Sequence, residues 1–267
     1  MISDFLSAFL RLGRVTRLTS SWKGYHRLKR LYRRVLPADL TVRIANFDRD
    51  LTLDVNLWHE TGFCLWHYPE LYEKEAREVF CSAIRPGCTV LDVGANIGIY
   101  TLLAAKRGAR VFSVEADPVN AIQLRRHIQI NGYSDRVTVL EIAATECDKT
   151  VPLYRHPWNM GESNICRKGE PSGTVLGRRL DSFNLPPIDV CKMDIEGAEL
   201  MALTGMRETL SRSPNLRLVI EYAEANGSGR LLIDFLKENF TTLQVLETLP
   251  DAPGNLIPPF CNILATR

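Results

Sequence analysis

One stretch of the sequence decides the fold, and it reads Val90-Leu-Asp-Val-Gly-Ala-Asn-Ile-Gly-Ile-Tyr-Thr101. It contains a short apolar run, a turn with two glycines and the start of a helix, in that order. This succession is typical of the first strand–turn–helix unit of a Rossmann-like sheet, where ligands bind at the carboxyl ends of the strands. We therefore expect an α/β fold with a ligand site at this turn.

The spacing of the glycines indicates which ligand the turn accepts. A dinucleotide site needs Gly-x-Gly-x-x-Gly, because its glycines let the backbone approach a pyrophosphate. Counted from Gly94, the second and third positions of that pattern hold Asn96 and Ile99, whose side chains would obstruct the phosphates. Gly94 and Gly98 with Asn96 between them suit a ligand that presents a carboxylate and an amino group. The amino-acid end of S-adenosylmethionine fits that description.

Two acidic residues flank the turn. Glu115 ends the second predicted strand, where a carboxylate can accept hydrogen bonds from both hydroxyls of a ribose. Nicotinamide dehydrogenases share an acid at this place, so Glu115 alone does not separate the two classes of cofactor. Asp92 precedes the turn, and two roles stay open for it: it anchors the loop through backbone N–H groups, or it contacts the ammonium group of the donor.

From Thr89 onward, short β-branched runs alternate with helix-length amphipathic segments, which predicts a mostly parallel sheet with helices on both faces. The predicted strands cover 89–93, 110–115, 136–142, 187–194, 215–222, 241–247 and 260–266. The predicted helices cover about 98–107, 118–131, 198–211 and 228–239, and Asp117-Pro118 is a good helix start. The segment 157–177 interrupts the alternation, and we predict a loop over the site there. The residues expected to cover the acceptor are Trp158, Asn159, Gly161, Glu162, Ser163 and Asn164.

The chain before residue 87 is expected to add smaller pieces. Residues 41–47 and 51–57 alternate on a period of two, which predicts a β-hairpin, and residues 70–84 have helical spacing. The first 36 residues hold nine Lys or Arg and one acid. Their apolar residues at helical spacing predict a basic amphipathic helix: Leu28, Leu31, Tyr32 and Val35.

The basic arm leaves alternatives open, because such a helix can lie on an anionic membrane or nucleic acid, or it can pack on the body with its charges in water. Among anionic partners we expect a membrane surface and not nucleic acid. The predicted domains are the arm (1–36), the hairpin and helix (37–86) and the main domain (87–267). No apolar run approaches the ~20 residues of a membrane span, and no cleavage site follows the start, so we expect a cytoplasmic protein. The seven scattered cysteines predict reduced thiols.

With these residues in view, the sequence resembles the FkbM family of methyltransferases. Residues 91–98 are close to the cofactor motif of that family, and Lys192-Met-Asp-Ile-Glu-Gly-Ala-Glu199 looks like its second signature. Tyr72-Glu73 before Arg85-Pro86-Gly87, and Arg179-Leu180-Asp181, agree in order, so the resemblance covers about 68–222. It implies a class I methyltransferase fold of seven strands, the last antiparallel. It also implies methyl transfer from S-adenosylmethionine, commonly to a hydroxyl of a sugar, glycolipid or natural product.

The turn and the resemblance together assign the donor site. The residues expected to bind S-adenosylmethionine are Tyr72, Glu73, Asp92, Gly94, Ala95, Asn96, Gly98, Thr101, Glu115, Ala116, Ala143 and Asp194.

The second signature places carboxylates at the carboxyl end of a buried strand, beside the donor turn. An acceptor alcohol has a proton to lose, and we predict that Asp194 takes it as general base. Glu196 then orients the acceptor, or it joins Glu221 in holding a divalent cation. No metal ligand is assigned from the sequence. Glu199 is expected to favour the dipole of the following helix, and Lys192 to form an ion pair with a neighbouring carboxylate.

Other residues are weaker candidates. His67 and His156 are alternative bases that flank the expected cleft. Trp58, Trp66 and Tyr68 either form an aromatic wall for a sugar or lipid, or pack between the hairpin and the main domain.

Three other functions remain to be weighed. A nicotinamide dehydrogenase is disfavoured by the missing glycines at Asn96 and Ile99. A methyltransferase for nucleic acid or protein nitrogen is favoured by the basic arm, but residues 192–199 lack the Asp/Asn-Pro-Pro-aromatic signature that such enzymes often carry. A non-catalytic module that binds S-adenosylmethionine would keep its function when Asp194 is replaced by Asn.

Overall fold

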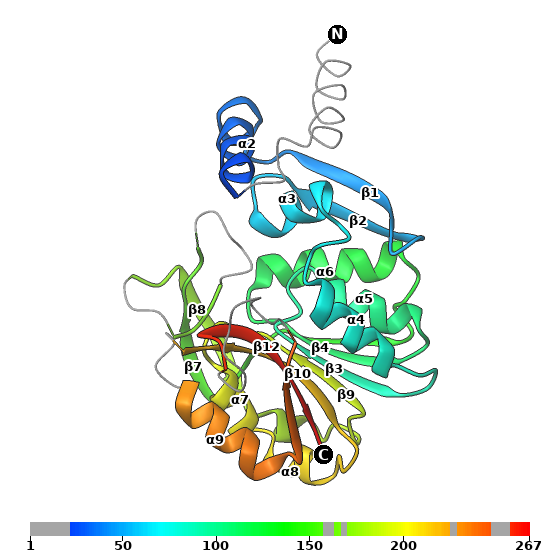
Figure 1. The fold of residues 1–267 in the computed structure, drawn as a ribbon, viewed down its shortest axis with the longest axis vertical. Helices are drawn as coiled ribbons and strands as arrows, with labels where there is room; N and C mark the ends of the chain where they lie inside the picture. Colours follow the sequence, from blue (N-terminus) through cyan, green and yellow to red (C-terminus); the bar gives the residue numbers. More distant parts are fainter. Residues whose placement is uncertain (1–21, 157–162, 167–169, 225–228, 247–256) are drawn as a thin grey trace. The chain divides into compact units, whose positions relative to one another are not determined.

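The computed structural model describes residues 22–156, 163–166, 170–224, 229–246 and 257–267, and side chains from residue 27 onward except residue 28 (Figure 1). The chain forms two compact units, residues 1–72 with 157–161 and residues 73–156 with 162–267. Each unit buries apolar side chains of its own. The predicted boundaries at residues 36 and 86 stay a prediction.

The first unit contains the predicted hairpin and the predicted basic helix. β1 (Thr41–Phe47) pairs antiparallel with β2 (Leu51–Asn56), so the hairpin is confirmed. Helix α2 (Trp22–Val35) precedes it, and helix α3 (Glu60–His67), which was not predicted, follows it.

The packed face of α2 differs from the predicted stripe. Tyr32 is buried with its ring edge against Phe63, and Leu36 is buried as well, whereas Leu31 and Val35 are exposed. The predicted helix is confirmed, but among the described residues of its apolar stripe only Tyr32 is packed, and Leu31 and Val35 are not. Tyr32 packs toward α3, because a large ring buries more apolar surface than an aliphatic side chain.

The second unit is built on a sheet of seven strands in the order β11-β12-β10-β9-β3-β4-β5. Its strands are β3 (Thr89–Val93), β4 (Arg110–Val114), β5 (Val137–Leu140), β9 (Val190–Met193), β10 (Arg217–Ala223), β11 (Thr242–Val245) and β12 (Phe260–Thr266). β12 runs antiparallel to both neighbours, and the other pairs are parallel. The fold class is confirmed, and every predicted strand of this sheet lies within three residues of its observed bounds.

Helices cover both faces of this sheet (Figure 1). α4 (Lys74–Ala83) and α5 (Ile99–Lys106) bury Phe80 and Ala104 against Val90 and Val219. α7 (Glu199–Thr204), α8 (Arg207–Ser211) and α9 (Gly229–Asn239) cover the opposite face. α6 (Pro118–Ile130) begins as predicted, since the Asp117 carboxylate accepts from the Val119 backbone N–H.

The predicted single helix over 198–211 is wrong, because the segment forms α7 and α8 with a break at Gly205. A Cβ on Gly205 would lie 2.0 Å from the Thr145 carbonyl oxygen, so a neighbouring chain segment passes close to the backbone there. The Gly205 carbonyl accepts from the Asp181 backbone N–H, which removes it from helical pairing.

A smaller sheet was not predicted. β7 (Lys149–Leu153) pairs antiparallel with β8 (Gly173–Arg178), and β6 (Ala143–Ala144) pairs parallel with β8, which leads into a short 3-10 helix (Leu180–Phe183). The prediction of loop up to residue 177 is therefore wrong, because the glycines of β8 concealed a strand that backbone pairing alone defines. The predicted loop residues Trp158, Asn159, Gly161 and Glu162 lie outside the described residues.

None of the seven cysteines, all of which lie in the described residues, forms a disulfide. Over the described residues, none of the helices combines the length and the apolar character that a membrane span requires.

Candidate active site

The site lies at the carboxyl edge of the large sheet. The chain continues from β3 to β4 on one side, whereas the other neighbour of β3 is β9, so the direction of winding reverses there. Ligands of open α/β sheets bind at such a reversal, beyond the carboxyl ends of the strands. The glycine turn after β3, residues 94–98, and the carboxylates after β9 meet at this point.

The glycine turn is shaped by close approach. Gly94 has φ +83°, and a Cβ there would lie 1.9 Å from the Asp194 carbonyl oxygen, so only glycine lets the two loops touch. Gly98 has φ +98° and packs against Leu124. The backbone N–H groups of Gly94 and Ala95 both donate to the Val114 carbonyl at 2.9 Å, which fixes the turn to β4.

Asn96 is the residue of the turn that fits a ligand most directly. Its backbone lies in the left-handed region at φ +50°, a conformation that asparagine tolerates better than most residues. Its Oδ1 is buried and accepts no hydrogen bond from the residues that the structure describes. A buried acceptor without a donor is costly, and an ammonium or hydroxyl group of a bound ligand would satisfy it.

Glu115 directly follows β4 (Arg110–Val114) and lies behind the turn. Its two carboxylate oxygens accept from the backbone N–H groups of Asn96 (2.7 Å) and Asp117 (2.8 Å). Burial raises the pKa of Glu115 to about 7, although these two N–H groups lower it. The Asn120 side chain donates to the carboxylate as well. A carboxylate has about four acceptor positions, so Glu115 can still accept a hydrogen bond from a ribose hydroxyl. The ribose contact itself stays a prediction.

Asp92 anchors the start of α5. Its carboxylate accepts from the Thr101 hydroxyl at 2.6 Å, and that hydroxyl lies 2.7 Å from the Ser113 hydroxyl. Burial raises the pKa of Asp92 to about 6 against the hydrogen bond from Thr101 and the charge of Lys192. Of the two roles left open, this geometry supports anchoring, through a side-chain hydroxyl in the helix and not through the backbone of the loop. Contacts of Asp92 and Thr101 with the donor stay predictions.

Lys192 forms the predicted ion pair. Its ammonium contacts Asp194 Oδ2 at 3.2 Å and Asn262 Oδ1 at 3.3 Å, and it lies 5.3 Å from the centre of the Tyr100 ring. Burial lowers the pKa of Lys192, but the carboxylates of Asp194, Glu73 and Glu221 outweigh it, so the net shift is upward. The Tyr100 hydroxyl donates to Glu73 Oε2 at 2.7 Å, which places predicted residue Glu73 beside this network.

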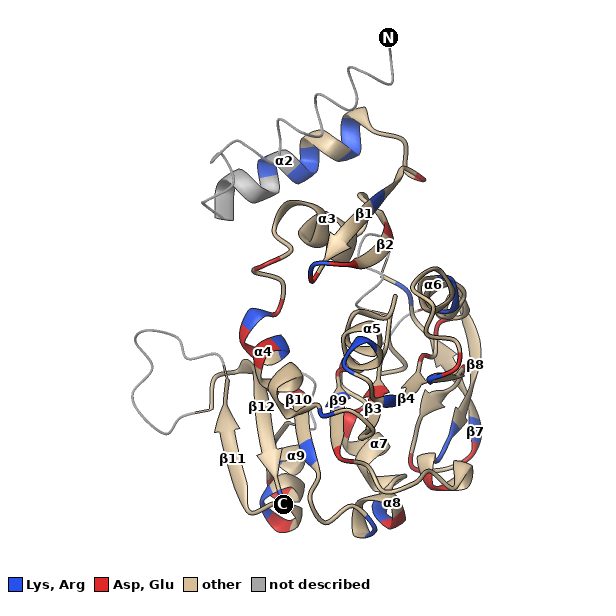
Figure 2. Cartoon of the chain, turned by 90° about the vertical axis from the view of Figure 1, so that its right-hand side faces the viewer, with Lys and Arg blue, Asp and Glu red and all other residues tan. Residues whose placement is uncertain are grey.

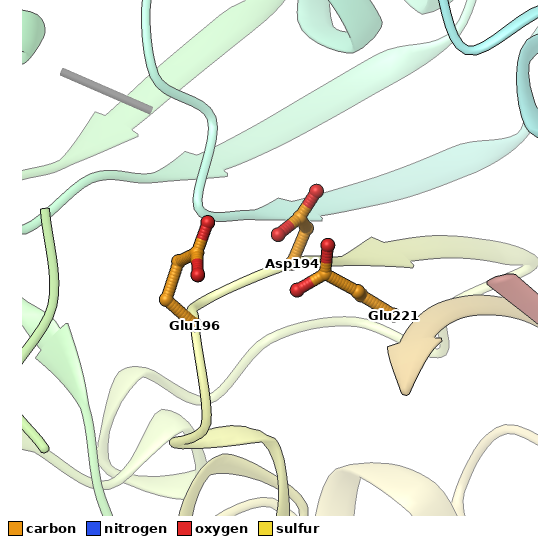
Figure 3. Close-up of side chains that lie close together, drawn as sticks. All are labelled: Asp194, Glu196 and Glu221. Carbon is orange, nitrogen blue, oxygen red and sulfur yellow. The ribbon is translucent and has the colours of Figure 1, made fainter. Parts of the chain in front are cut away.

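The candidate catalytic carboxylates come together at the ends of β9 and β10 (Figure 3). Asp194, Glu196 and Glu221 each offer an oxygen within 4.8 Å of the others. Glu196 sits at φ +56°, in the left-handed region. Burial raises the pKa of Glu221 to about 10, and the negative charges of Asp194 and Glu196 add to the shift.

Glu199 lies at the start of a helix, as predicted, and it also holds the preceding turn. It is the first residue of α7, and its carboxylate accepts from the backbone N–H groups of Ile195 and Gly197 at 3.1 Å each. These bonds hold the turn that carries Asp194 and Glu196.

An unpredicted ion pair lies beside the start of α6. The Arg155 guanidinium donates two 2.7 Å hydrogen bonds to the buried Asp117 carboxylate. Ser163 Oγ donates to the same carboxylate at 3.3 Å, and the backbone of Asn164 pairs with Tyr154. The two described residues of the predicted covering loop are thus tied to this corner. Arg155 and Asp117 are 38 residues apart in the sequence, so no local pattern indicated their ion pair.

The other predicted residues divide between the units. Ala116 follows Glu115, and Ala143 is buried in β6 opposite Gly177. Tyr72, His67, Trp58, Trp66 and Tyr68 belong to the first unit. There His67 ends α3 with its ring 4.5 Å from that of Phe63, and Trp58 Nε1 donates to the Leu36 carbonyl. Roles of these residues, and of His156, toward the donor or acceptor stay predictions.

Comparison with known proteins identifies the relatives of this chain. The family model described as "Methyltransferase FkbM domain" matches residues 92–243, more than half of the chain. The 2-O-methyltransferase NoeI of Sinorhizobium fredii is 27% identical over 52% of this chain and 66% of that protein. An arginine N(omega)-methyltransferase of Streptomyces achromogenes is 35% identical over 31% of this chain and 24% of that protein. The match thus spans less than two thirds of either relative.

Solved structures agree with the fold. The putative transferase PH0793 of Pyrococcus horikoshii has a TM-score of 0.51 and 12% identity, over 90% of this chain and 81% of that one. At this identity the likeness concerns the fold alone.

Proposed function

Because this chain belongs to the FkbM family of methyltransferases, we propose that it transfers the methyl group of S-adenosylmethionine to a hydroxyl oxygen of a sugar, glycolipid or other natural product. One observation carries the proposal. Asp194 stands at the carboxyl end of β9, its backbone touches the glycine turn, and its carboxylate is 28% exposed. A carboxylate beside the donor turn can meet the acceptor there.

S-adenosylmethionine supplies a methyl group on a positively charged sulfur. The residues that fit its amino-acid end are those of the glycine turn, where Asn96 Oδ1 lacks a donor among the described residues. Glu115 fits the ribose, because its carboxylate faces the same turn. The task left to the protein is to align the acceptor oxygen with the methyl carbon and to remove the hydroxyl proton.

Asp194 is suited to take that proton. Lys192 contacts Oδ2 and thereby orients the carboxylate, whereas Oδ1 accepts no hydrogen bond from a described residue. Glu196, on the same turn, lies close enough to orient the acceptor. The name of NoeI, a 2-O-methyltransferase, supports oxygen as the acceptor atom.

Nitrogen is the second candidate for the acceptor atom. A relative is named as an arginine methyltransferase, and a cluster of carboxylates would also attract a cationic guanidinium or amine. The two candidates differ in what the acceptor brings: a neutral hydroxyl has to lose a proton to a base, whereas a guanidinium is held by charge.

The test is transfer of labelled methyl from S-adenosylmethionine to panels of hydroxyl and of amino or guanidino acceptors, with S-adenosylhomocysteine binding measured separately. We expect a hydroxyl acceptor. Asp194→Asn should lower turnover about 100-fold or more, the range for loss of a general base, with little change in S-adenosylhomocysteine affinity. The exposed Asp135→Asn is the matched control and should behave as wild type.

Methylation of nitrogen acceptors alone would refute the assignment of oxygen. Full turnover by Asp194→Asn would refute the assigned base. Binding of NAD without binding of S-adenosylhomocysteine would refute the proposed function as a whole.

A further inference from the structure

The cluster of Asp194, Glu196 and Glu221 presents oxygen atoms to a common point. Asp194 and Glu196 come from the turn after β9, and Glu221 comes from β10, the adjacent strand. The three carboxylates face one another (Figure 3), within 4.8 Å. Like charges this close repel, so a proton on one carboxylate or a positive charge between them lowers the free energy of the arrangement.

Glu221 gives an independent indication that a ligand belongs there. It is only 8% exposed, and within the described part of the chain no donor gives its carboxylate a hydrogen bond. Buried carboxylates are normally hydrogen-bonded or paired. The carboxylate points to Asp194 and Glu196 (Figure 3), so the partner that satisfies it has to occupy the space shared by all three.

The dimensions and the ligand type suit a small hard cation. Ligands on opposite sides of an ion are about 4.2 Å apart for Mg²⁺ and about 4.6–5.2 Å for Ca²⁺, given their bond lengths. The observed limit of 4.8 Å falls in this range. All three groups are carboxylates, with no His or Cys among them, which favours Mg²⁺, Mn²⁺ or Ca²⁺ over zinc or copper.

We propose that Asp194, Glu196 and Glu221 bind one divalent cation of the oxygen-preferring class. The binding site stands on its own geometry, and only its part in catalysis rests on the proposed function. Such an ion lowers the pKa of a hydroxyl that it contacts. One carboxylate oxygen of Asp194 binds the ion, and the other can still take the acceptor proton, so the base assigned above is retained.

Binding is tested with Mn²⁺ on the full chain after removal of metal by EDTA, with the free ion followed by electron paramagnetic resonance. We expect saturable binding of one Mn²⁺. Glu196→Gln and Glu221→Gln should each weaken it about tenfold or more, since each removes a charged ligand. Glu238→Gln, at an exposed position of α9, is the control and should bind as wild type. Circular dichroism checks that each variant folds. If Glu221→Gln does not fold, Glu196→Gln, at a half-buried position, still tests the site.

Two outcomes overturn the cation site: no saturable Mn²⁺ binding at millimolar concentration, or equal binding by wild type and both site variants. The methyl-transfer assay with EDTA separates failure of the cation site from failure of the proposed function. Transfer that persists with EDTA in a chain that binds no Mn²⁺ refutes the cation and leaves the proposed function standing. Mn²⁺ binding with the expected variant pattern, but without transfer to any hydroxyl, refutes the proposed function and leaves the site standing.

A separate observation concerns helix α2. Arg27, Arg30 and Arg34 are exposed together with Leu31 and Val35, at spacings of three and four residues that place all five on one face. Basic residues follow the helix in Figure 2.

The opposite face of α2 is used for packing. Tyr32 is buried there against Phe63, and Lys29 pairs with Glu60. The exposed face of α2 therefore presents Arg27 and Arg34 beside Leu31 and Val35.

We infer that this face of α2 binds the surface of an anionic lipid bilayer. The arginines complement lipid phosphates, and Leu31 and Val35 are placed to enter the interface between headgroups and chains, as in interfacial amphipathic helices. This would bring the enzyme close to a lipid-linked acceptor.

The test is sedimentation of the full chain with vesicles of phosphatidylcholine, with and without about 30% phosphatidylglycerol, a proportion chosen to mimic the anionic leaflet. We expect binding only to the anionic vesicles, and a loss of about tenfold or more in Arg27→Glu/Arg34→Glu. Arg230→Glu/Lys237→Glu on exposed positions of α9 changes the net charge equally and should retain binding. No binding to anionic vesicles, equal loss in both double variants, or binding to RNA in place of vesicles would overturn the inference.

Discussion

Replacing Gly94 by alanine tests whether close approach of two loops builds the donor site. The new Cβ would lie 1.9 Å from the Asp194 carbonyl oxygen, so the backbone of one loop has to move. A left-handed conformation costs a non-glycine residue about 1–2 kcal/mol, and forced repacking costs about 1–3 kcal/mol more. We expect the free energy of unfolding to fall by about 2–5 kcal/mol from these two terms together. Displacement of the turn should also weaken S-adenosylhomocysteine binding.

Gly87 supplies a matched control for the backbone term. Its φ of +82° is almost that of Gly94, but a Cβ there meets nothing within 4 Å. Gly87→Ala therefore carries the conformational cost without the collision. The difference between the two variants, about 1–3 kcal/mol, corresponds to a melting temperature lower by about 2–12 °C in Gly94→Ala. Differential scanning calorimetry gives the melting temperatures, and isothermal titration calorimetry gives the affinities for S-adenosylhomocysteine. Equal melting temperatures and equal affinities in the two variants would refute the reasoning.

Two further predictions concern the acids around the turn. S-adenosylhomocysteine affinity should rise with pH through about 7, the pKa of Glu115, because the ionised carboxylate is the better acceptor for a ribose hydroxyl. Calorimetric titration from pH 6 to 8 measures the affinity, and a pH dependence that survives in Glu115→Gln would exclude Glu115 as its source. Thr101→Val removes the hydroxyl that donates to buried Asp92 at 2.6 Å and should lower the free energy of unfolding by about 1–3 kcal/mol. Thr101→Ser keeps the hydroxyl and should lower it less. Equal free energies of unfolding for the two variants in denaturant would contradict the role given to that hydroxyl.

The large sheet was predictable because its strands are buried runs of β-branched residues with turn residues at their ends. β3 and β12 match the predicted bounds at both ends. The small sheet was not predictable on these grounds. β8 contains Gly173 and Gly177, and a Cβ on Gly177 would lie 2.9 Å from the Lys149 carbonyl, so this strand exists through close backbone pairing and not through an apolar face. A periodicity of side chains carries no information about such a strand.

The candidate site was predictable where it lies within one motif. Gly94, Asn96 and the pairing of Lys192 with Asp194 all follow from residues close in sequence. Asn262 was not predicted as a site residue, and Glu221 was only one of several acidic residues in the second half of the sequence. Both contribute through strands that are far apart in sequence, so their relation to the site depends on the register of the sheet.

The register of the sheet places polar side chains from separate strands in one row. Lys192 is opposite Asp92 in β3 and opposite Val219 in β10, and Glu221 is opposite Asn262 in β12. Since side chains alternate between faces, residues in register, or two positions further along a strand, project to the same face. Asp92, Lys192, Glu221 and Asn262 therefore face the side covered by α4 and α5. The neighbouring positions Leu91, Cys191, Ile220 and Ile263 fill the opposite core. A shift of β10 by one residue would move Glu221 into that apolar core, so the burial that stabilises the sheet also fixes the position of the third carboxylate.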